Sequence, residues 1–126
     1  MSFSDTTGLA LGVIDWCEKN IGVNKKRHRP RLTLLGGIID DMPNTTYGEY
    51  DVDNNLISIN FERNVYVRSL IKTIIHEYTH YLQPVKTKYW KLEKKYGYHD
   101  NPLEVEARFN ENTKYKDCFK TLKKIL

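Results

Sequence analysis

This sequence has few cysteines and no apolar run long enough to span a membrane. Cys17 and Cys118 are its only cysteines, and their separation fits no metal-binding spacing. We therefore predict that both are reduced core residues of an intracellular, cytoplasmic protein, while a disulfide between them stays open. Residues 9–14 are apolar but have no basic region ahead of them, so we expect no signal peptide. Internal repeats and low-complexity tracts are also absent.

The composition is that of a folded domain. Of 126 residues, 40% are apolar and 29% are charged, which is enough apolar surface for one core. We therefore treat residues 1–126 as a single domain. The net charge of +4 comes mainly from residues 25–31, 86–95 and 114–124, which we interpret as solvated basic surfaces. Nucleic acid stays open as a partner of these surfaces, but no nucleic-acid motif supports it.

Residues 74–83 carry the pattern around which the rest of the chain is interpreted. Residues 76–80 read His-Glu-Tyr-Thr-His, the H-E-x-x-H signature of zinc metallopeptidases. Because residues four apart lie on one face of a helix, His76 and His80 are able to bind one ion. Glu77 lies beside them, where its carboxylate can accept a proton from a metal-activated water. The other face of this helix is apolar at helical spacing, which predicts burial.

The N-terminal part predicts a helix followed by a strand. Apolar residues recur at helical spacing between residues 9 and 21, and we expect this helix to pack behind a sheet. Residues 31–35 predict a buried strand, and Ile38-Ile39 predicts its continuation or a second short strand. Residues 40–46 contain two aspartates, a proline and an asparagine, which predicts a loop.

A hairpin leads into the H-E-x-x-H helix. Residues 47–60 alternate in the manner of two strands, and residues 53–55 supply Asp and Asn for the turn between them. Asn64 is a suitable cap for a helix that runs from about residue 65 to residue 83. Pro84 ends this helix, because a proline disfavours helical geometry in the residue before it.

The C-terminal part predicts further helices. Residues 86–95 have the pattern of a short amphipathic helix, and residues 96–100 that of a loop. Asn101 and Pro102 then form the start of a last helical region, which we expect to break near Asn112-Thr113. The whole pattern predicts an α+β fold with a small mixed or antiparallel sheet packed on the H-E-x-x-H helix.

A catalytic zinc has three protein ligands and one open position, so a third ligand must come from another segment. The best candidate is Glu104, at the start of the last helical region. Glu104 also stands three residues after Asn101, the spacing of a capping box, and would then only cap its own helix. Glu106, His99 and Asp100 are the alternative ligands. Glu106 would otherwise orient a ligand histidine or lie in solvent.

The motif His76-Glu77-Tyr78-Thr79-His80, followed by Glu104-Val105-Glu106-Ala107, resembles the gluzincin metallopeptidases. The end of the first helix, Tyr81-Leu82-Gln83-Pro84, is similar to that of small single-domain peptidases found among phage and bacterial proteins. The resemblance covers about residues 47–108. It implies a minimal zincin-like domain whose edge strand binds peptide by strand addition. Gluzincins often have Asp after the alanine of the second motif, whereas this chain has Arg108.

Residues and resemblance together predict a zinc-dependent peptidase that is a monomer and acts on a peptide or protein. Zn²⁺ bound by His76, His80 and Glu104 would activate water for Glu77 to deprotonate. Tyr98 or His99 would be the oxyanion donor. Two alternatives remain. One is a phage accessory protein that binds zinc as a structural or interaction module without turnover. The other is a SprT-like protease that acts on DNA-bound protein through the basic surfaces.

Overall fold

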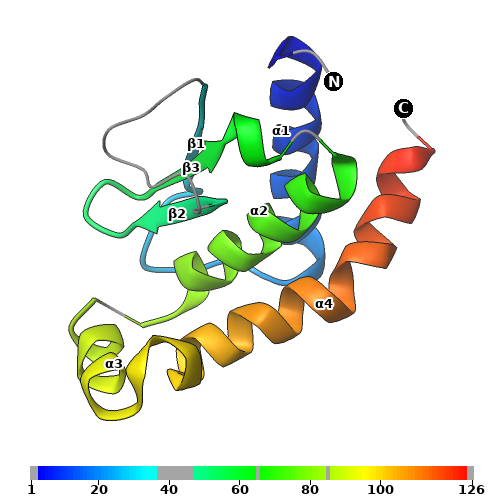
Figure 1. The fold of residues 1–126 in the computed structure, drawn as a ribbon. Helices are drawn as coiled ribbons and strands as arrows, with labels where there is room; N and C mark the ends of the chain where they lie inside the picture. Colours follow the sequence, from blue (N-terminus) through cyan, green and yellow to red (C-terminus); the bar gives the residue numbers. More distant parts are fainter. Residues whose placement is uncertain (1–2, 37–46, 65, 85, 125–126) are drawn as a thin grey trace.

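The computed structural model describes residues 3–36, 47–64, 66–84 and 86–124, with the side chains of residues 3, 4, 86 and 87 left out. The described residues form four α-helices and three strands, which confirms the predicted α+β class (Figure 1). In chain order these are α1 (Phe3–Asn20), β1 (Arg31–Leu35), β2 (Gly48–Asp51), β3 (Leu56–Asn60), the short 3-10 helix η1 (Phe61–Arg63), α2 (Val67–Leu82), α3 (Lys86–Asp100) and α4 (Pro102–Lys123). The predictions for Ile38-Ile39 and residues 40–46 lie outside the described residues.

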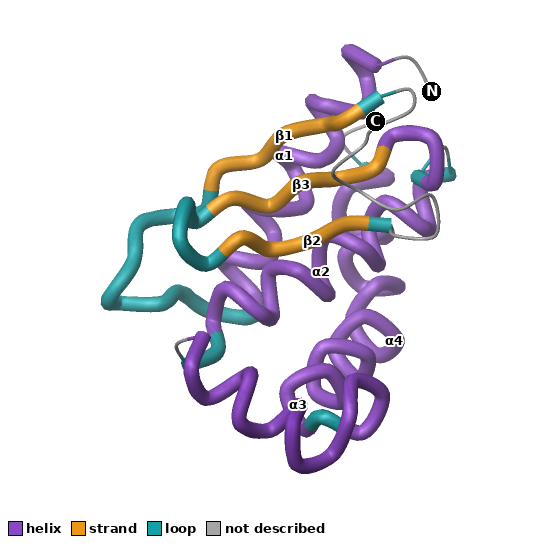
Figure 2. The backbone as a smooth tube through the Cα atoms, turned by 60° about the vertical axis from the view of Figure 1, so that its left-hand side comes forward, coloured by secondary structure: helices purple, strands orange, loops and turns teal. Residues whose placement is uncertain are grey.

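The three strands form one small mixed sheet in the order β1-β3-β2. β3 lies in the middle, where it pairs in parallel with β1 and antiparallel with β2 (Figure 2). The register places Leu32 beside Ile57 and Gly48 beside Ile59. Among the described residues no strand pairs with the outer side of β2, so β2 is an edge strand.

α2 lies between the sheet and α4, and α1 packs against α2, α4 and β1 (Figures 1 and 2). α2 is amphipathic because its apolar residues recur every three or four positions. They form one core with residues of α1, the middle strand and α4: Leu9, Ala10, Val13, Ile14, Trp16, Cys17, Ile57, Ile59, Leu70, Ile71, Ile74, Ile75, Tyr78, Tyr81, Cys118 and Leu122. Both cysteines are buried free thiols within this core, as predicted.

The hairpin approaches α2 closely at Gly48. A Cβ atom at this position would lie 2.8 Å from the Thr73 side chain and 3.0 Å from the Ser58 carbonyl oxygen, so the approach requires glycine. Asn64 strengthens the same junction. Its amide donates to the carbonyl oxygens of Tyr47 and Asn60, and it accepts from the Thr73 hydroxyl at 2.8 Å.

The prediction that Asn64 caps α2 is wrong. The helix begins at Val67, after Tyr66, and no side chain caps it. Asn64 is fully buried and its polar atoms are used by the hairpin and by Thr73, so none faces the first turn of α2. The predicted end of the helix is confirmed, since Leu82 is its last residue and Pro84 follows.

Two predictions for the C-terminal part are also wrong. The loop predicted for residues 96–100 is reduced to one non-helical residue, Gly97 (φ 80°, ψ 172°), where α3 kinks before it continues to Asp100. Nor does α4 break near Asn112-Thr113. This helix runs without interruption from Pro102 to Lys123, and its packing along α2 offsets the weak helix propensity of those two residues. None of the helices in the described part of the chain is long and apolar enough to cross a membrane.

Candidate metal centre

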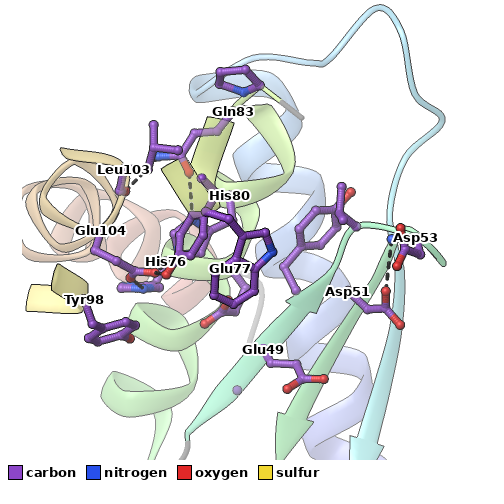
Figure 3. Close-up of a pocket in the computed structure, with 16 residues that line it drawn as sticks. Glu49, Asp51, Asp53, His76, Glu77, His80, Gln83, Tyr98, Leu103 and Glu104 are labelled. Carbon is purple, nitrogen blue, oxygen red and sulfur yellow. Dashed lines mark hydrogen bonds and ion pairs between the residues drawn. The ribbon is translucent and has the colours of Figure 1, made fainter. Parts of the chain in front are cut away.

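Three predicted ligands meet at the interface between α2 and α4 (Figure 3). His76 and His80 project from α2, and Glu104 projects from the first turn of α4. One ligand atom of each residue lies within 4.8 Å of the others. The Glu104 carboxylate lies between the two rings, with Oε1 at 3.0 Å from Nε2 of His76 and Oε2 at 3.1 Å from Nε2 of His80. These three residues could therefore hold a metal ion.

The structure distinguishes between the candidates for the third ligand. Glu104 does not form a capping box, because the Asn101 backbone amide donates to the Tyr98 carbonyl oxygen at 3.3 Å and not to the Glu104 carboxylate. Only 3% of Glu104 is exposed, and its carboxylate faces the histidines. His99 and Asp100 pair with each other at the surface, with their side chains 85% and 78% exposed. They are not part of the cluster.

The nitrogen atoms on the far side of each ring fix the tautomers. Nδ1 of His76 lies 2.8 Å from the Glu111 carboxylate, and Nδ1 of His80 lies 2.7 Å from Oε1 of Gln83. A carboxylate and an amide oxygen both accept hydrogen bonds, so each Nδ1 carries a proton and donates it. Each Nε2 faces an oxygen of the Glu104 carboxylate, so it carries the additional proton while no metal is bound. Loss of that proton leaves the Nε2 lone pair that metal binding requires.

The orientation of Gln83 is fixed by its own partners. Its amide nitrogen donates to the Leu103 carbonyl oxygen at 2.8 Å and to the Glu106 carboxylate at 2.7 Å. A flipped amide would put its oxygen against these two acceptors, so Oε1 must face His80. Glu106 thus acts on the cluster through Gln83, which agrees with the prediction that it orients a ligand histidine.

Spacing and donor type both fit a metal ion. Metal–nitrogen and metal–oxygen bonds of about 2.0–2.2 Å in a tetrahedral site separate neighbouring ligand atoms by about 3.3 Å. The two nitrogen–oxygen separations at Glu104 are a few tenths of an ångström shorter. Tyr89 also donates to Oε2 of Glu104 at 2.5 Å, so the carboxylate is held from a third side. Residues of this type bind zinc and other first-row metals.

Protons occupy the cluster when no metal is bound. Burial disfavours the charged form of His76, but hydrogen bonds with the Glu104 and Glu111 carboxylates outweigh it and raise its pKa to about 10. Burial also lowers the pKa of His80, but the hydrogen bond with Glu104 outweighs it, so this pKa is raised as well. In Glu104 burial acts to raise the pKa, but the two histidines hold it well below its usual range. A metal ion that binds here must therefore displace protons.

Glu77 lies next to this cluster and is only 8% exposed. Burial raises the pKa of its carboxyl, and the Glu104 and Glu49 carboxylates add to the effect, while both histidines oppose it. A buried carboxylate of raised pKa beside a metal cluster is typical of a general base.

Two cavities meet at Glu77. The larger has a volume of about 550 Å³ and the smaller one of about 420 Å³, and Gly48, His76, Glu77 and Tyr98 line both. The whole of β2 lines the larger cavity. Together the two cavities form a cleft that runs past the cluster along the edge strand.

Of the two predicted oxyanion donors, Tyr98 alone lies at this cleft. Tyr98 lines both cavities, and its pKa is raised by burial and by the Glu104 carboxylate. His99 lines neither cavity and its side chain lies in solvent.

Sequence reasoning missed three residues of the site, which are Gln83, Tyr89 and Glu111. Glu111 had a usable signal, because a residue seven positions after Glu104 lies on the same helix face. Gln83 stands three residues after His80, a spacing that also permits contact. For Tyr89 we find no signal, since its contact depends on how α3 returns to α4.

Comparisons with models of protein families, with curated proteins and with solved structures found no match for this chain.

Proposed function

We propose that this protein is a zinc-dependent peptidase of the gluzincin type. The observation that carries the proposal is the meeting of His76, His80 and Glu104 beside the buried Glu77. A surface helix that carried two histidines by chance would have no reason to bury a carboxylate between them, since an unpaired buried charge is costly.

Zinc suits this donor set better than magnesium or calcium does. Two imidazole nitrogens and one carboxylate oxygen leave a fourth tetrahedral position for a water or a substrate. Magnesium and calcium prefer oxygen ligands alone. A zinc ion held by these residues would supply Lewis acidity and a water of lowered pKa.

Glu77 is the proposed catalytic base. Its raised pKa brings the carboxyl nearer to neutral pH, where a base both accepts a proton from water and returns it to a leaving amine. Tyr98, on the cleft wall, is the proposed donor to the oxyanion.

Glu111 supports the gluzincin assignment and accounts for Arg108. Gluzincins often have a carboxylate directly after the alanine of the second motif, where this chain has Arg108. The carboxylate that binds His76 here comes from Glu111 instead, less than one further turn along α4. Arg108 donates to the His99 carbonyl oxygen, away from the cluster.

The test is zinc content and peptide cleavage of the purified protein beside its Glu77→Gln variant. We expect both proteins to retain zinc. General acid–base catalysis contributes about 10²–10⁴-fold, so the variant should cleave at least about a hundredfold more slowly. Zinc retention without cleavage of any peptide or protein would favour a structural zinc module. Equal cleavage by both proteins would refute the role of Glu77.

A further inference from the structure

Within the residues that the structure describes, no strand pairs with the outer edge of β2, which lies along the cleft. The Asn60 amide donates to the Tyr47 carbonyl oxygen, which marks residues 47 and 60 as a hydrogen-bonded pair. Such pairs alternate along an antiparallel ladder, so Glu49 and Asp51 also direct their backbone groups to β3. Gly48 and Tyr50 therefore direct theirs outward, where an extended peptide can pair with them.

Successive side chains of β2 lie on opposite faces of the sheet. Gly48 faces Thr73 of α2, and the Tyr50 ring contacts Tyr81 of α2 at a centroid distance of 6.2 Å. Glu49 and Asp51 consequently lie on the face turned away from α2. Figure 3 shows these two carboxylates following one another along the strand.

Carboxylates gather in the larger cavity. Glu49, Asp51, Asp53, Glu77 and Glu104 line it, and none of the other described lining residues is Lys or Arg. In the smaller cavity Lys72 accompanies the carboxylates of Glu77 and Glu111. The acidic residues are therefore most numerous at the end of the cleft that β2 forms.

We infer that the substrate is a cationic peptide with Lys or Arg at two alternate positions, bound as a fourth strand beside β2. The inference rests on the proposed peptidase function and names its substrate class. If the peptide pairs antiparallel to β2, its residues opposite Glu49 and Asp51 form pairs without mutual hydrogen bonds, in which side chains approach most closely. Because a peptide strand also alternates, only every second residue would meet these carboxylates.

Glu49 is the better residue for a test, because its side chain is exposed and Asp51 has a structural role. The Asp51 carboxylate accepts from the backbone amides of Asp53 and Asn54 and from the Asn54 side chain, so its substitution would disturb the turn. Opposite charges across a strand pair contribute about two- to fivefold in affinity, and like charges oppose binding by a similar factor. Replacing Lys by Glu in the peptide should therefore change affinity about tenfold.

The experiment compares three labelled extended peptides that differ only at two alternate positions. Both positions are Lys in the first peptide, Gln in the second and Glu in the third. Binding is measured by fluorescence anisotropy with the zinc-loaded Glu77→Gln protein, so that no cleavage occurs. We expect the order Lys, then Gln, then Glu, with the difference reduced at high salt because it is electrostatic. Adding Glu49→Lys should abolish this order, because one position then meets Lys and the other still meets Asp51. Adding Asp117→Lys, which makes the same change of charge at an exposed position of α4, should leave the order unchanged.

Equal affinity for the three peptides, or an order that Glu49→Lys leaves unchanged, would overturn the inference. Cleavage of the same peptides by the parent protein separates this failure from that of the proposed function. If all three are cleaved at similar rates, the peptidase assignment stands and the charge selection is wrong. If the Lys peptide binds as expected but is not cleaved, the selection stands and catalysis is wrong. Neither binding nor cleavage would overturn both.

Discussion

Removal of the Glu111 carboxylate should weaken metal binding, although this residue is not a ligand. Glu111 accepts from Nδ1 of His76 at 2.8 Å, which fixes the ring and increases the electron density at Nε2. The Glu111 side chain is 22% exposed and that of His76 is 15% exposed, so water weakens this pair only in part. Glu111→Ala removes both the orientation and the charge, whereas Glu111→Gln keeps an acceptor and removes only the charge.

Loss of such a partner costs about 10- to 100-fold in metal affinity, or about 1.4–2.7 kcal/mol. At low pH, competition between protons and the metal for the histidines reduces this loss of metal affinity. Burial lowers the pKa of His76, but Glu104 and Glu111 raise it to about 10, so Glu111 favours the bound proton as well as the bound metal. Its removal then helps the metal in the competition with protons. We therefore expect Glu111→Ala to lose more affinity at about pH 9 than at about pH 6, and Glu111→Gln to lose less at both.

The assay is competition for zinc with a chromophoric chelator at the two pH values. Thermal unfolding of each variant in chelator shows whether the metal-free fold is intact. Asp117→Ala, on the same helix but exposed, is the matched control and should bind zinc like the parent. If Glu111→Ala bound zinc as tightly as this control at both pH values, the hydrogen bond would have no influence on the metal, and our account of the site would be wrong.

Three further predictions concern the fold and the metal. Gly48→Ala should destabilise the protein by about 1–3 kcal/mol in chemical denaturation, because the added Cβ would lie 2.8 Å from the Thr73 side chain. Combining it with Thr73→Ser should restore part of the lost stability. An unchanged denaturation midpoint for Gly48→Ala would refute the close approach. Zinc at about a hundred times its dissociation constant should stabilise the protein by about 2.7 kcal/mol, measured as a rise in melting temperature that chelator reverses. The metal-free protein should lose stability as pH rises from about 6.5 to about 10. Burial lowers the pKa of His76, but the Glu104 and Glu111 carboxylates outweigh it and raise this pKa to about 10, so the protonated ring stabilises the fold below its unfolded pKa and this stabilisation is lost as the ring deprotonates. A melting temperature that rose over this range would contradict the prediction.

Local signals in the sequence were sufficient for the helix that carries His76 and His80. The spacing of His76 and His80 and the stop at Pro84 depend on residues within one helix, and the structure confirms both. The parallel pairing of β1 with β3 was not predictable in the same way. It joins Arg31 to Leu56, which stand 25 positions apart in the sequence, and no local pattern specifies a partner at that distance.

The third ligand shows where sequence reasoning loses resolution. Glu104 and Glu106 both stand near the start of α4, and the choice between them depends on how the helix is rotated about its axis. The structure settles the rotation through Asn101, which caps α4 alone, and through Ala107, which is fully buried and permits close packing. The same rotation places Glu111, seven positions after Glu104, on the face that bears Glu104.

The charges at the interface of α2 and α4 argue that metal binding and helix packing depend on each other. Glu77, Glu104 and Glu111 face two imidazoles there, and each Nδ1 already donates its proton to a partner. Without a metal, the negative charge is offset by extra protons on the Nε2 atoms of His76 and His80. These protons are lost as the solution becomes alkaline, and the carboxylates then repel one another in a buried site. A divalent cation supplies the same positive charge at any pH at which the ligands are deprotonated. Its binding should therefore hold α4 against α2 under conditions in which protons no longer do.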